Sequence, residues 1–269
     1  MKIKETDQLN RNVIADLLGS DFDVEVAECL GSTNKELWGK ALQGVDDGYV
    51  LIAKRQTQGR GRLGRSFLSE EGGLYMSLLL RPTLSPEDTA LITPIAALAV
   101  AEAIEKHTAH TASIKWVNDV YCNGKKVCGI LTEAKIDPVS LKTDFVIVGV
   151  GLNVYMPDCG FPDELKDIAG ALITNGQAEA NLLNRLAADI VKRIADYAGH
   201  PFEKEKLGAY RNRCFVLGEN VRVFRGNESF DAVAVDIDDR FGLIIHGEDG
   251  ACHTLTSGEV SVRIKDGAR

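Results

Sequence analysis

The chain has 269 residues, 45% of them hydrophobic, which is enough to bury the core of one large domain or of one large and one small domain. Its formal net charge of −8 argues against nonspecific nucleic-acid binding, because a polyphosphate would be repelled on average. No stretch reaches the ~18 uninterrupted apolar residues of a membrane span, and residues 1–7 lack the apolar region of a signal peptide. We therefore expect a cytoplasmic protein whose six cysteines are reduced thiols.

Apolar periodicity predicts alternating helices and strands up to residue 198. The predicted helices lie at residues 10–18, 33–42, 86–104 and 181–198. The predicted strands lie at residues 24–30, 50–57, 74–81, 113–121, 127–135 and 144–155. Thr33 and Glu36 have the spacing of a capping box, and Pro94 either kinks the third helix or restarts it. Asn123-Gly124 favours a hairpin turn between two of the strands.

After Arg213 the sequence changes to short β-rich runs that are separated by turn residues. The five predicted strands lie at residues 215–224, 230–237, 242–246, 252–256 and 260–264. Strands of this length and spacing are typical of a small all-β barrel. We therefore expect a larger domain at residues 1–212 and a separate small β-barrel domain at residues 213–269.

The stretch with the most unusual composition reads GRGRLGR at residues 59–65 and lies between two predicted strands. Glycine lets the backbone come close to a ligand, and arginine presents a rigid fork of donors to phosphate or carboxylate. The composition of this Gly/Arg loop (residues 59–65) therefore predicts that the loop becomes ordered over an anionic, phosphate-bearing ligand. A solvated charged turn would have the same composition. Its glycines also match the pattern G-x-G-x-x-G of a dinucleotide-binding fingerprint. That fingerprint requires a helix directly after the glycines, but the sequence of residues 65–73 predicts a turn.

Four further polar clusters stand near the ends of predicted strands. They occupy residues 32–34, 115–119, 124–129 and 149–153. Taken singly, each has a structural explanation: a helix cap, a turn, a solvated hairpin residue, or a pair of glycines needed for packing. Strand-end glycines also let a ligand approach closely, so the five segments together predict a binding site.

In this order and spacing, the segments resemble the motifs of biotin–protein ligases, also called biotin–[acetyl-CoA-carboxylase] ligases. The matching motifs are GRGRxGR at residues 59–65, K-W-x-N-D at 115–119, K-x-x-G-I at 126–130 and G-x-G-x-N at 149–153, and more loosely Ser257-Gly258-Glu259-Val260. The resemblance implies an α+β fold, in which a mixed-sheet catalytic domain of the biotin/lipoate ligase type is followed by a small SH3-like β-barrel.

The resemblance implies an enzyme that uses ATP to form an amide bond. Biotin would first be activated as biotinyl-5′-AMP and then transferred to a lysine of a biotin carboxyl carrier protein domain. ATP, Mg²⁺ and this carrier domain are the implied partners; neither DNA nor a membrane is expected, and a homodimer is allowed. Some relatives carry an N-terminal DNA-binding domain, but only 31 residues precede Ser32, so we expect the monofunctional type.

The resemblance also assigns roles to individual residues. We expect Lys126 to contact both the biotin carboxylate and the α-phosphate, Arg62 to hold the adenylate, and Asp119 to act as a base, a metal ligand or a positioning group. The residues expected to bind biotin are Ser32, Thr33, Asn34, Gln56, Gly59, Arg60, Arg62, Trp116, Lys126, Gly129, Gly149 and Gly151. The residues expected to bind ATP are Arg60, Arg62, Arg65, Phe67, Asn118, Lys126 and Asn153. No metal site made by the protein alone is expected.

Two other functions compete with this one. A lipoate/octanoate–protein ligase would share the fold and the adenylate chemistry, but lipoate has no ureido group to pair with Ser32, Thr33, Asn34 and Gln56. Buried polar groups left without a partner reject such a ligand strongly. A noncatalytic biotin-sensing regulator is the other alternative, and the presence of Lys126 and an intact Gly/Arg loop argues against it.

Overall fold

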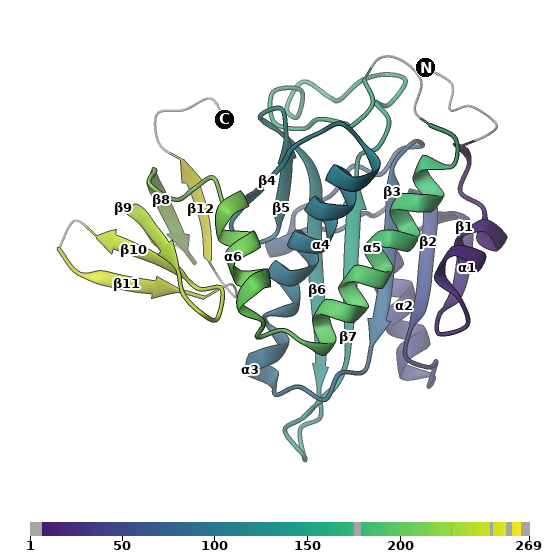
Figure 1. Cartoon of the computed structure of the whole chain (residues 1–269), viewed down its shortest axis with the longest axis horizontal. Helices are drawn as coiled ribbons and strands as arrows, with labels where there is room; N and C mark the ends of the chain where they lie inside the picture. Colours follow the sequence, from purple (N-terminus) through teal and green to yellow (C-terminus); the bar gives the residue numbers. More distant parts are fainter. Residues whose placement is uncertain (1–6, 175–178, 227, 248–249, 257–259, 265–269) are drawn as a thin grey trace.

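The computed structural model of the chain describes residues 7–174, 179–226, 228–247, 250–256 and 260–264. These residues form one large and one small β-sheet, and most of the helices pack on the large sheet (Figure 1). The α+β class predicted from the sequence is confirmed. Residues 257–259 of the loosely matching C-terminal motif lie outside the described residues. Within the described ranges, no helix combines the length and the apolar character that crossing a membrane requires.

The large sheet contains seven strands in a mixed arrangement. They are β1 (Asp23–Leu30), β2 (Tyr49–Gln56), β3 (Leu74–Leu80), β4 (Ala112–Lys115), β5 (Asp119–Cys122), β6 (Lys125–Ile136) and β7 (Thr143–Leu152). Their spatial order is β1-β2-β3-β7-β6-β5-β4; β1 runs parallel to β2, and the other neighbouring pairs are antiparallel. β3 is buried along its whole length, as expected of a central strand that is covered on both faces.

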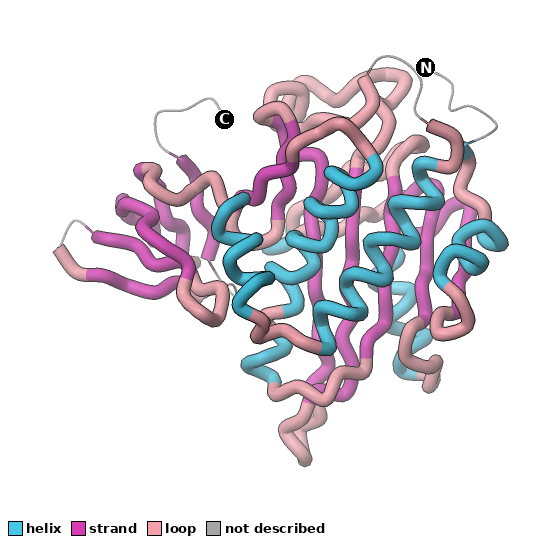
Figure 2. The backbone as a smooth tube through the Cα atoms, viewed as in Figure 1, coloured by secondary structure: helices cyan, strands magenta, loops and turns pink. Residues whose placement is uncertain are grey.

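Helices cover the two faces of the large sheet unequally (Figures 1 and 2). α1 (Arg11–Leu18), α4 (Ile92–His107) and α5 (Leu182–Gly199) lie on one face, where α4 packs against β4–β7 and α5 against β3. α2 (Thr33–Leu42) lies on the opposite face, over β2, β3 and β7. Because α2 covers only part of that face, the remainder is available to the Gly/Arg loop. The short helix α3 (Pro86–Thr89) ends before α4, so Pro94 lies in the first turn of a restarted helix.

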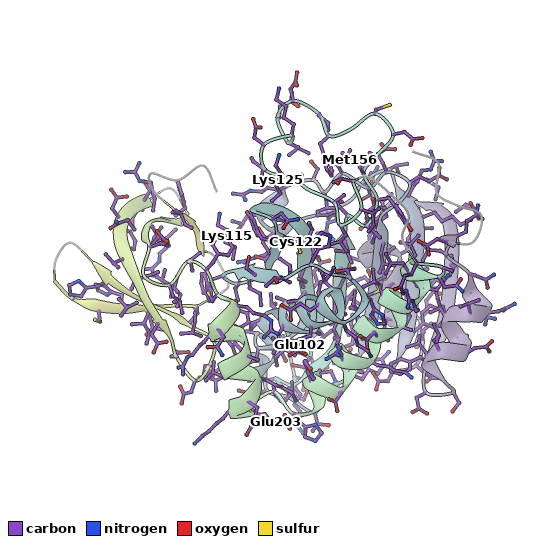
Figure 3. The ribbon with its side chains drawn as sticks, turned by 45° about the horizontal axis from the view of Figure 1, so that its top comes forward. Glu102, Lys115, Cys122, Lys125, Met156 and Glu203 are labelled. Atoms are coloured by element: carbon purple, nitrogen blue, oxygen red, sulfur yellow. The ribbon has the colours of Figure 1, made fainter. Side chains whose placement is uncertain are left out.

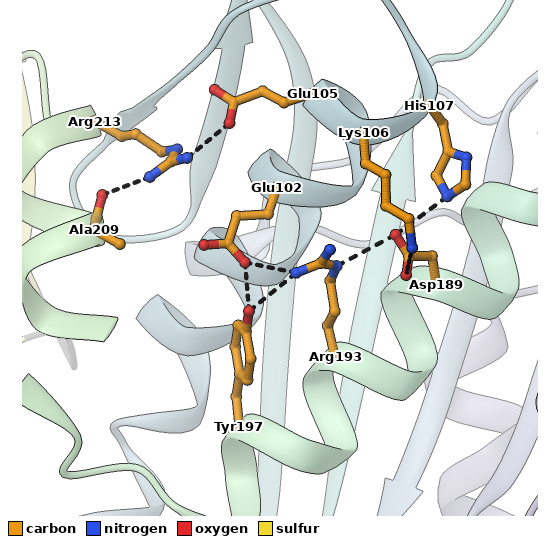
Figure 4. A network of polar contacts seen from close by, with 9 residues as sticks. All are labelled: Glu102, Glu105, Lys106, His107, Asp189, Arg193, Tyr197, Ala209 and Arg213. Atoms are coloured by element: carbon orange, nitrogen blue, oxygen red, sulfur yellow. Dashed lines mark hydrogen bonds and ion pairs between the residues drawn. The ribbon is translucent and has the colours of Figure 1, made fainter. Parts of the chain in front are cut away.

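Charged side chains join α4 to α5 on the helix-rich face (Figure 4). Arg193 of α5 lies 2.8 Å from Glu102 of α4 and 3.3 Å from Asp189 of its own helix. Asp189 also lies 3.0 Å from Lys106 and 3.2 Å from His107, both on α4. The contacts of Arg193 and Asp189 with α4 cross from one helix to the other and add polar contacts to the apolar packing of α4 against α5.

α6 (Lys204–Arg213) is missing from the elements predicted for this chain. Its sequence, KEKLGAYRNR, has no apolar stripe from which a helix could be recognised. Tertiary contacts hold it instead: Tyr210 is fully buried, and Arg213 lies 2.7 Å from Glu105 of α4 (Figure 4). Packing against α4 therefore compensates for a weak local signal.

The small sheet contains five antiparallel strands in the order β11-β10-β9-β8-β12. They are β8 (Asn220–Arg225), β9 (Glu228–Ile237), β10 (Leu243–Gly247), β11 (Cys252–Leu255) and β12 (Val260–Ile264). The five predicted strands are thus confirmed, although the first begins later than expected. Residues 215–218 form turns instead, and Phe215 N donates to Ile114 O at 3.1 Å, which connects this segment to β4.

Trp116 connects the two sheets. Its side chain is buried, and its Nε1 donates to the backbone oxygen of Phe241 at 2.9 Å. The ring of Phe241 in turn packs edge-on against Tyr210, with the ring centroids 5.2 Å apart. On the surface, Arg240 lies 2.7 Å from Asp88 and adds a weaker, exposed contact between the same parts of the chain.

We expect Trp116→Phe to lower the free energy of unfolding by about 1–3 kcal/mol, because the buried oxygen of Phe241 loses its donor. Urea unfolding of the full chain measures this. Trp38→Phe is the matched control, since Trp38 packs on Phe145 and its indole N–H has no hydrogen-bond partner in the described part of the chain. Equal losses in the two variants would show that ring packing, and not the hydrogen bond, is what Trp116 contributes.

Two local predictions are wrong. Residues 113–121 form two antiparallel strands, β4 and β5, rather than one. The turn between them is possible because distant groups pair with its backbone: Tyr210 Oη donates to Val117 O at 3.1 Å, and Ile130 N donates to Asn118 O at 3.0 Å. The capping box at Thr33 is also absent, because Ser32 is the N-cap residue of α2 and the Thr33 hydroxyl bonds to β2 instead.

Candidate functional site

Neutral polar side chains meet where β1 leads into α2. Ser32, Thr33 and Asn34 occupy this junction, and all three are buried. Gln56, the last residue of β2, accepts through Oε1 from the backbone N of Thr33 at 2.8 Å and from its Oγ1 at 3.1 Å. Gln56 Nε2 donates to Ser69 Oγ at 2.9 Å. The group is therefore pre-arranged by its own hydrogen bonds, with the donors and acceptors of four side chains close together.

Ser77 of β3 and Gly149 of β7 lie beneath Asn34. Ser77 Oγ lies 2.8 Å from Thr33 Oγ1 and 2.6 Å from Asn34 Oδ1, and Asn34 Nδ2 donates to Leu131 O at 3.1 Å. A Cβ atom at Gly149 would lie 2.1 Å from Asn34 Oδ1, so any side chain there would displace the amide. The polar pocket formed here has a volume of about 20 Å³, room for about one water molecule.

The Gly/Arg loop turns back on itself between β2 and β3. Gly61 N donates to Arg65 O at 2.7 Å, and Phe67 N donates to Gly59 O at 2.9 Å. A single 3₁₀ turn ends at Gly64, whose φ of 72° favours glycine. Residues 65–73 then reach β3 without forming a helix, which confirms that the glycines are not a dinucleotide fingerprint.

Phe67 lies over two strands at the positions of their glycines. Gly129 of β6 and Gly151 of β7 are directly paired. A Cβ atom at Gly151 would lie 2.8 Å from the Phe67 ring, and one at Gly129 would lie 3.4 Å from it. The ring also packs edge-on against Tyr75, at a centroid distance of 6.4 Å. The two glycines therefore make room for an aromatic ring as well as allowing a ligand to approach the strands.

A second cavity, of about 150 Å³, lies beside the polar pocket and carries positive charge. In this charged cavity, Lys126 Nζ lies 2.7 Å from Asp119 Oδ1, and Arg62 Nη1 donates to Asn118 Oδ1 at 2.9 Å. Burial lowers the pKa of the Arg62 guanidinium, and the carboxylate of Asp119 opposes this shift. Arginine stays protonated in proteins, so a partly dehydrated cation faces this cavity and favours an anionic ligand.

The polar pocket and the charged cavity meet at four residues. Arg60, Phe67, Gly129 and Leu131 line both of them. A ligand that extends from the polar pocket into the charged cavity would therefore pass Arg60 and Phe67. The arrangement suits a molecule with a neutral polar head and an anionic end that meets phosphate.

Most of the predicted site residues line one of the two cavities. The polar pocket is lined by Ser32, Thr33, Asn34, Gln56, Arg60, Phe67, Gly129, Gly149 and Gly151. The charged cavity is lined by Arg60, Arg62, Arg65, Phe67, Trp116, Asn118, Asp119, Lys126 and Gly129. Segments separated by more than a hundred positions in the sequence, such as those of Ser32 and Gly151, therefore converge as the order of motifs predicts.

Three residues that were predicted to bind biotin or ATP lie outside the two cavities or in the other cavity than expected. Asn153 is buried away from both cavities and donates through Nδ2 to Gly170 O at 3.1 Å. Gly59 is the buried first residue of the Gly/Arg loop and lines neither cavity; a Cβ atom there would approach Phe67 O to 2.3 Å. Trp116, expected at biotin, lines the charged cavity instead. Their binding roles remain predictions.

Sequence reasoning missed Ser77, Ser69 and Glu133, which contact site residues directly. Ser77 could have been recognised, because it is the one serine in the otherwise apolar and aromatic buried run Leu74–Leu80, and a small polar side chain buried there needs a partner. Ser69 had none, because it lies in an irregular loop. Glu133 resembles any solvent-facing residue of a strand, and its contact with Asn34 spans 99 positions.

Comparison with known proteins connects this geometry to a family. Residues 26–153 match the biotin/lipoate A/B protein ligase family, and residues 216–263 match the biotin protein ligase C terminal domain. The chain is 36% identical over 227 residues to the bifunctional ligase/repressor BirA of Bacillus subtilis, covering 83% of this chain and 69% of BirA. It is 33% identical over 249 residues to the biotin–[acetyl-CoA-carboxylase] ligase of Mycobacterium tuberculosis, covering 88% of each chain.

Solved structures agree with these sequence matches. The biotin protein ligase of Aquifex aeolicus in complex with biotin and ATP is similar with a TM-score of 0.73 and 34% identity, covering 90% of this chain and 99% of that chain. The matched regions contain both sheets and the two cavities. This chain belongs to the biotin/lipoate A/B protein ligase family.

Proposed function

We propose that this chain is an ATP-dependent biotin–protein ligase. An oxygen of the biotin carboxylate attacks the α-phosphorus of ATP, the bond to pyrophosphate breaks, and biotinyl-5′-AMP forms. The amine of a carrier lysine then attacks the acyl carbon of this mixed anhydride, an amide forms, and AMP leaves. Relatives named biotin–[acetyl-CoA-carboxylase] ligase and a similar structure with biotin and ATP support the proposal.

The junction of the two cavities is the observation that carries the proposal. The polar pocket offers neutral donors and acceptors, which suit the ureido group of biotin: Thr33 bonds to Gln56, and Ser77 Oγ lies within hydrogen-bond distance of both Thr33 and Asn34. The charged cavity offers Arg62 and Lys126 to the nucleotide phosphates. The carboxylate of biotin and the α-phosphate would meet between them. With about 20 Å³ free, the polar pocket must widen for the bicyclic ring to enter, which requires the Phe67 ring and the loop to shift.

Positive charge is what the first step needs from the protein. Two unit charges of like sign 4 Å apart repel by about 4 kcal/mol at an effective dielectric constant of 20. Lys126, beside Gly129 and near the junction, is our choice for the group that contacts both anions and stabilises the charge that develops between them. Arg60 and Arg62 would hold the phosphate on the other side.

The second step needs a proton acceptor and a dry site. The reference pKa of a lysine amine is ~10.4, so the carrier lysine arrives protonated. Asp119, 2.7 Å from Lys126, is the carboxylate that lines the charged cavity, and we propose that it either accepts this proton or positions Lys126. The Gly/Arg loop, closed over the anhydride, would exclude water until the carrier arrives.

Mg²⁺ enters the proposal together with the phosphates of ATP. Among the described residues, no group of three or more His, Cys, Asp or Glu side chains is arranged to hold a metal ion. Mg²⁺ does not need such a group, because it binds through substrate phosphates and waters with one or two protein carboxylates. Asp119 is the carboxylate that would stand beside it, and the ion would supply charge for the leaving pyrophosphate.

The remaining parts of the proposal concern organisation and partners. We propose a carboxylase carrier domain as the protein substrate, in keeping with the names of two relatives. We also propose a domain division near residue 213, supported by the end of α6 at Arg213 and by the separate hydrogen bonding of the two sheets. A cytoplasmic location, the lack of DNA binding and a homodimer remain predictions.

Ligand choice tests the proposed function against a lipoate/octanoate ligase. We expect calorimetric titration to give a dissociation constant for biotin at least ~100-fold below those of lipoate and octanoate, because only biotin pairs with the polar groups of the pocket. We also expect pyrophosphate release from ATP to require biotin. Equal binding or turnover with lipoate would contradict the assignment, and biotin binding without pyrophosphate release would favour a noncatalytic regulator.

A further inference from the structure

Glu133 links the Gly/Arg loop to the polar pocket without lining either cavity. It lies on β6, two residues beyond Leu131. Its Oε2 accepts from Asn34 Nδ2 at 3.0 Å, and both of its carboxylate oxygens lie 3.0 Å from Arg60 Nη1. One carboxylate thus holds a residue of the pocket and a residue of the loop at the same time.

The two contacts of Glu133 fix orientations that the site uses. Asn34 Nδ2 donates to Leu131 O and to Glu133, so its Oδ1 is turned toward Ser77 and Gly149 within the pocket. Arg60 is held through Nη1, and it lines the junction of both cavities. The Arg60 side chain is 47% exposed, so without Glu133 it would be free to swing into solvent.

We propose that Glu133 is a positioning residue that ties Arg60 of the loop to Asn34 of the pocket and so keeps the loop over the junction. The inference rests on the proposed function only for the identity of the ligand under the loop. The contacts of Glu133 with Arg60 and Asn34 do not depend on which ligand that is. Filling the pocket and closing the loop become linked, because both act on the same carboxylate.

Limited trypsin digestion of the full-length protein tests the tie, because trypsin cleaves after arginine and the loop carries Arg60, Arg62 and Arg65. Without ligand, we expect Glu133→Ala to be cut in the loop roughly three- to fivefold faster than the parent, as expected for losing a partly exposed ion pair. Glu133→Gln should fall between them, since its amide oxygen still accepts from Arg60 and Asn34. Glu28→Gln is the matched control, because it removes an exposed carboxylate of the edge strand β1 that pairs with Lys54 of β2 and contacts neither Arg60 nor Asn34.

The salt dependence of loop cleavage distinguishes the effect of the Glu133 charge from the effect of its side-chain volume. Raising the ionic strength should speed loop cleavage in the parent and in Glu28→Gln, and should do so far less in Glu133→Gln, where no ion pair remains to be screened. Loop cleavage that is equal in the parent, Glu133→Gln and Glu133→Ala at low salt would overturn the proposal. Should Glu133→Ala fail to fold, the isosteric Glu133→Gln still decides.

A second measurement extends the test to the reaction. We expect Glu133→Gln to release biotinyl-5′-AMP roughly two- to threefold faster than the parent, with pyrophosphate formation at saturating biotin and ATP changed less than twofold. Equal release rates in the two proteins would contradict the role in holding the loop. If the parent itself neither binds biotin nor forms pyrophosphate, the proposed function fails, while the ligand-free digestion still tests the tie.

Discussion

Lys126→Ala is expected to reduce the rate of biotinyl-5′-AMP formation by about 100- to 1000-fold, the usual cost of removing one preorganised electrostatic donor from an active site. The variant loses a cation at the place where two anions must meet. It also leaves Asp119 without the ammonium now 2.7 Å away, so that a carboxylate adds to the repulsion. Because this charge acts mainly in the transition state, the dissociation constant of biotin should change by less than about fivefold.

Pyrophosphate release measures the rate of biotinyl-5′-AMP formation, and calorimetry measures the dissociation constant of biotin. Lys125→Ala is the matched control: Lys125, labelled in Figure 3, is the neighbouring residue of β6, but its Nζ donates to Lys166 O and it lines neither cavity. We expect the control to keep its activity within twofold. If Lys126→Ala instead raises only the KM for biotin and leaves kcat unchanged, Lys126 binds the substrate in its ground state and does not stabilise the transition state.

The segments that sequence reasoning located correctly are those with a strong local signal. The apolar run Leu74–Leu80 is a fully buried strand, and Asn123-Gly124 forms the predicted hairpin turn, with positive φ at both residues. The loop arginines were identifiable because no core position explains three arginines among glycines. Local composition was enough for each of these.

The errors arose where distant contacts decide the conformation. α6 has no amphipathic stripe and depends on packing against α4. Thr33 was predicted as a helix cap, but its hydroxyl bonds to Gln56, 23 positions away, because the half-buried carboxamide of Gln56 offers a better-placed acceptor than the helix start. Glu133 was missed for the same reason, since its partners are brought to it only by the order of strands in the sheet. Residues that orient other site residues thus leave little trace in a single sequence.

Arg62→Gly should leave adenylate formation possible and make the enzyme release biotinyl-5′-AMP about tenfold or more faster, since a charge-assisted hydrogen bond contributes ~1.5–3 kcal/mol. The substitution removes the contact between Arg62 and Asn118 that holds the loop to the turn between β4 and β5. Asn118 itself stays in place, because its Nδ2 donates to Asp119 and to Ile130 O. The added glycine also raises the entropy cost of closing the loop. Forming the adenylate requires only brief closure, whereas retaining it requires the loop to stay closed.

Released biotinyl-5′-AMP acylates exposed lysines of unrelated proteins. Biotin labelling of an unrelated protein therefore measures how much adenylate the enzyme releases. The variant is incubated with biotin, ATP and albumin, and the albumin is blotted for biotin. Gln58→Gly is the matched control, because it adds a glycine to the same exposed segment without removing a charge, and we expect labelling close to that of the parent. If Arg62→Gly makes the adenylate but leaves albumin as unlabelled as the parent does, closure of the loop does not depend on Arg62. In that case the remaining contacts of the loop, among them the ion pair between Glu133 and Arg60, hold it in place without Arg62.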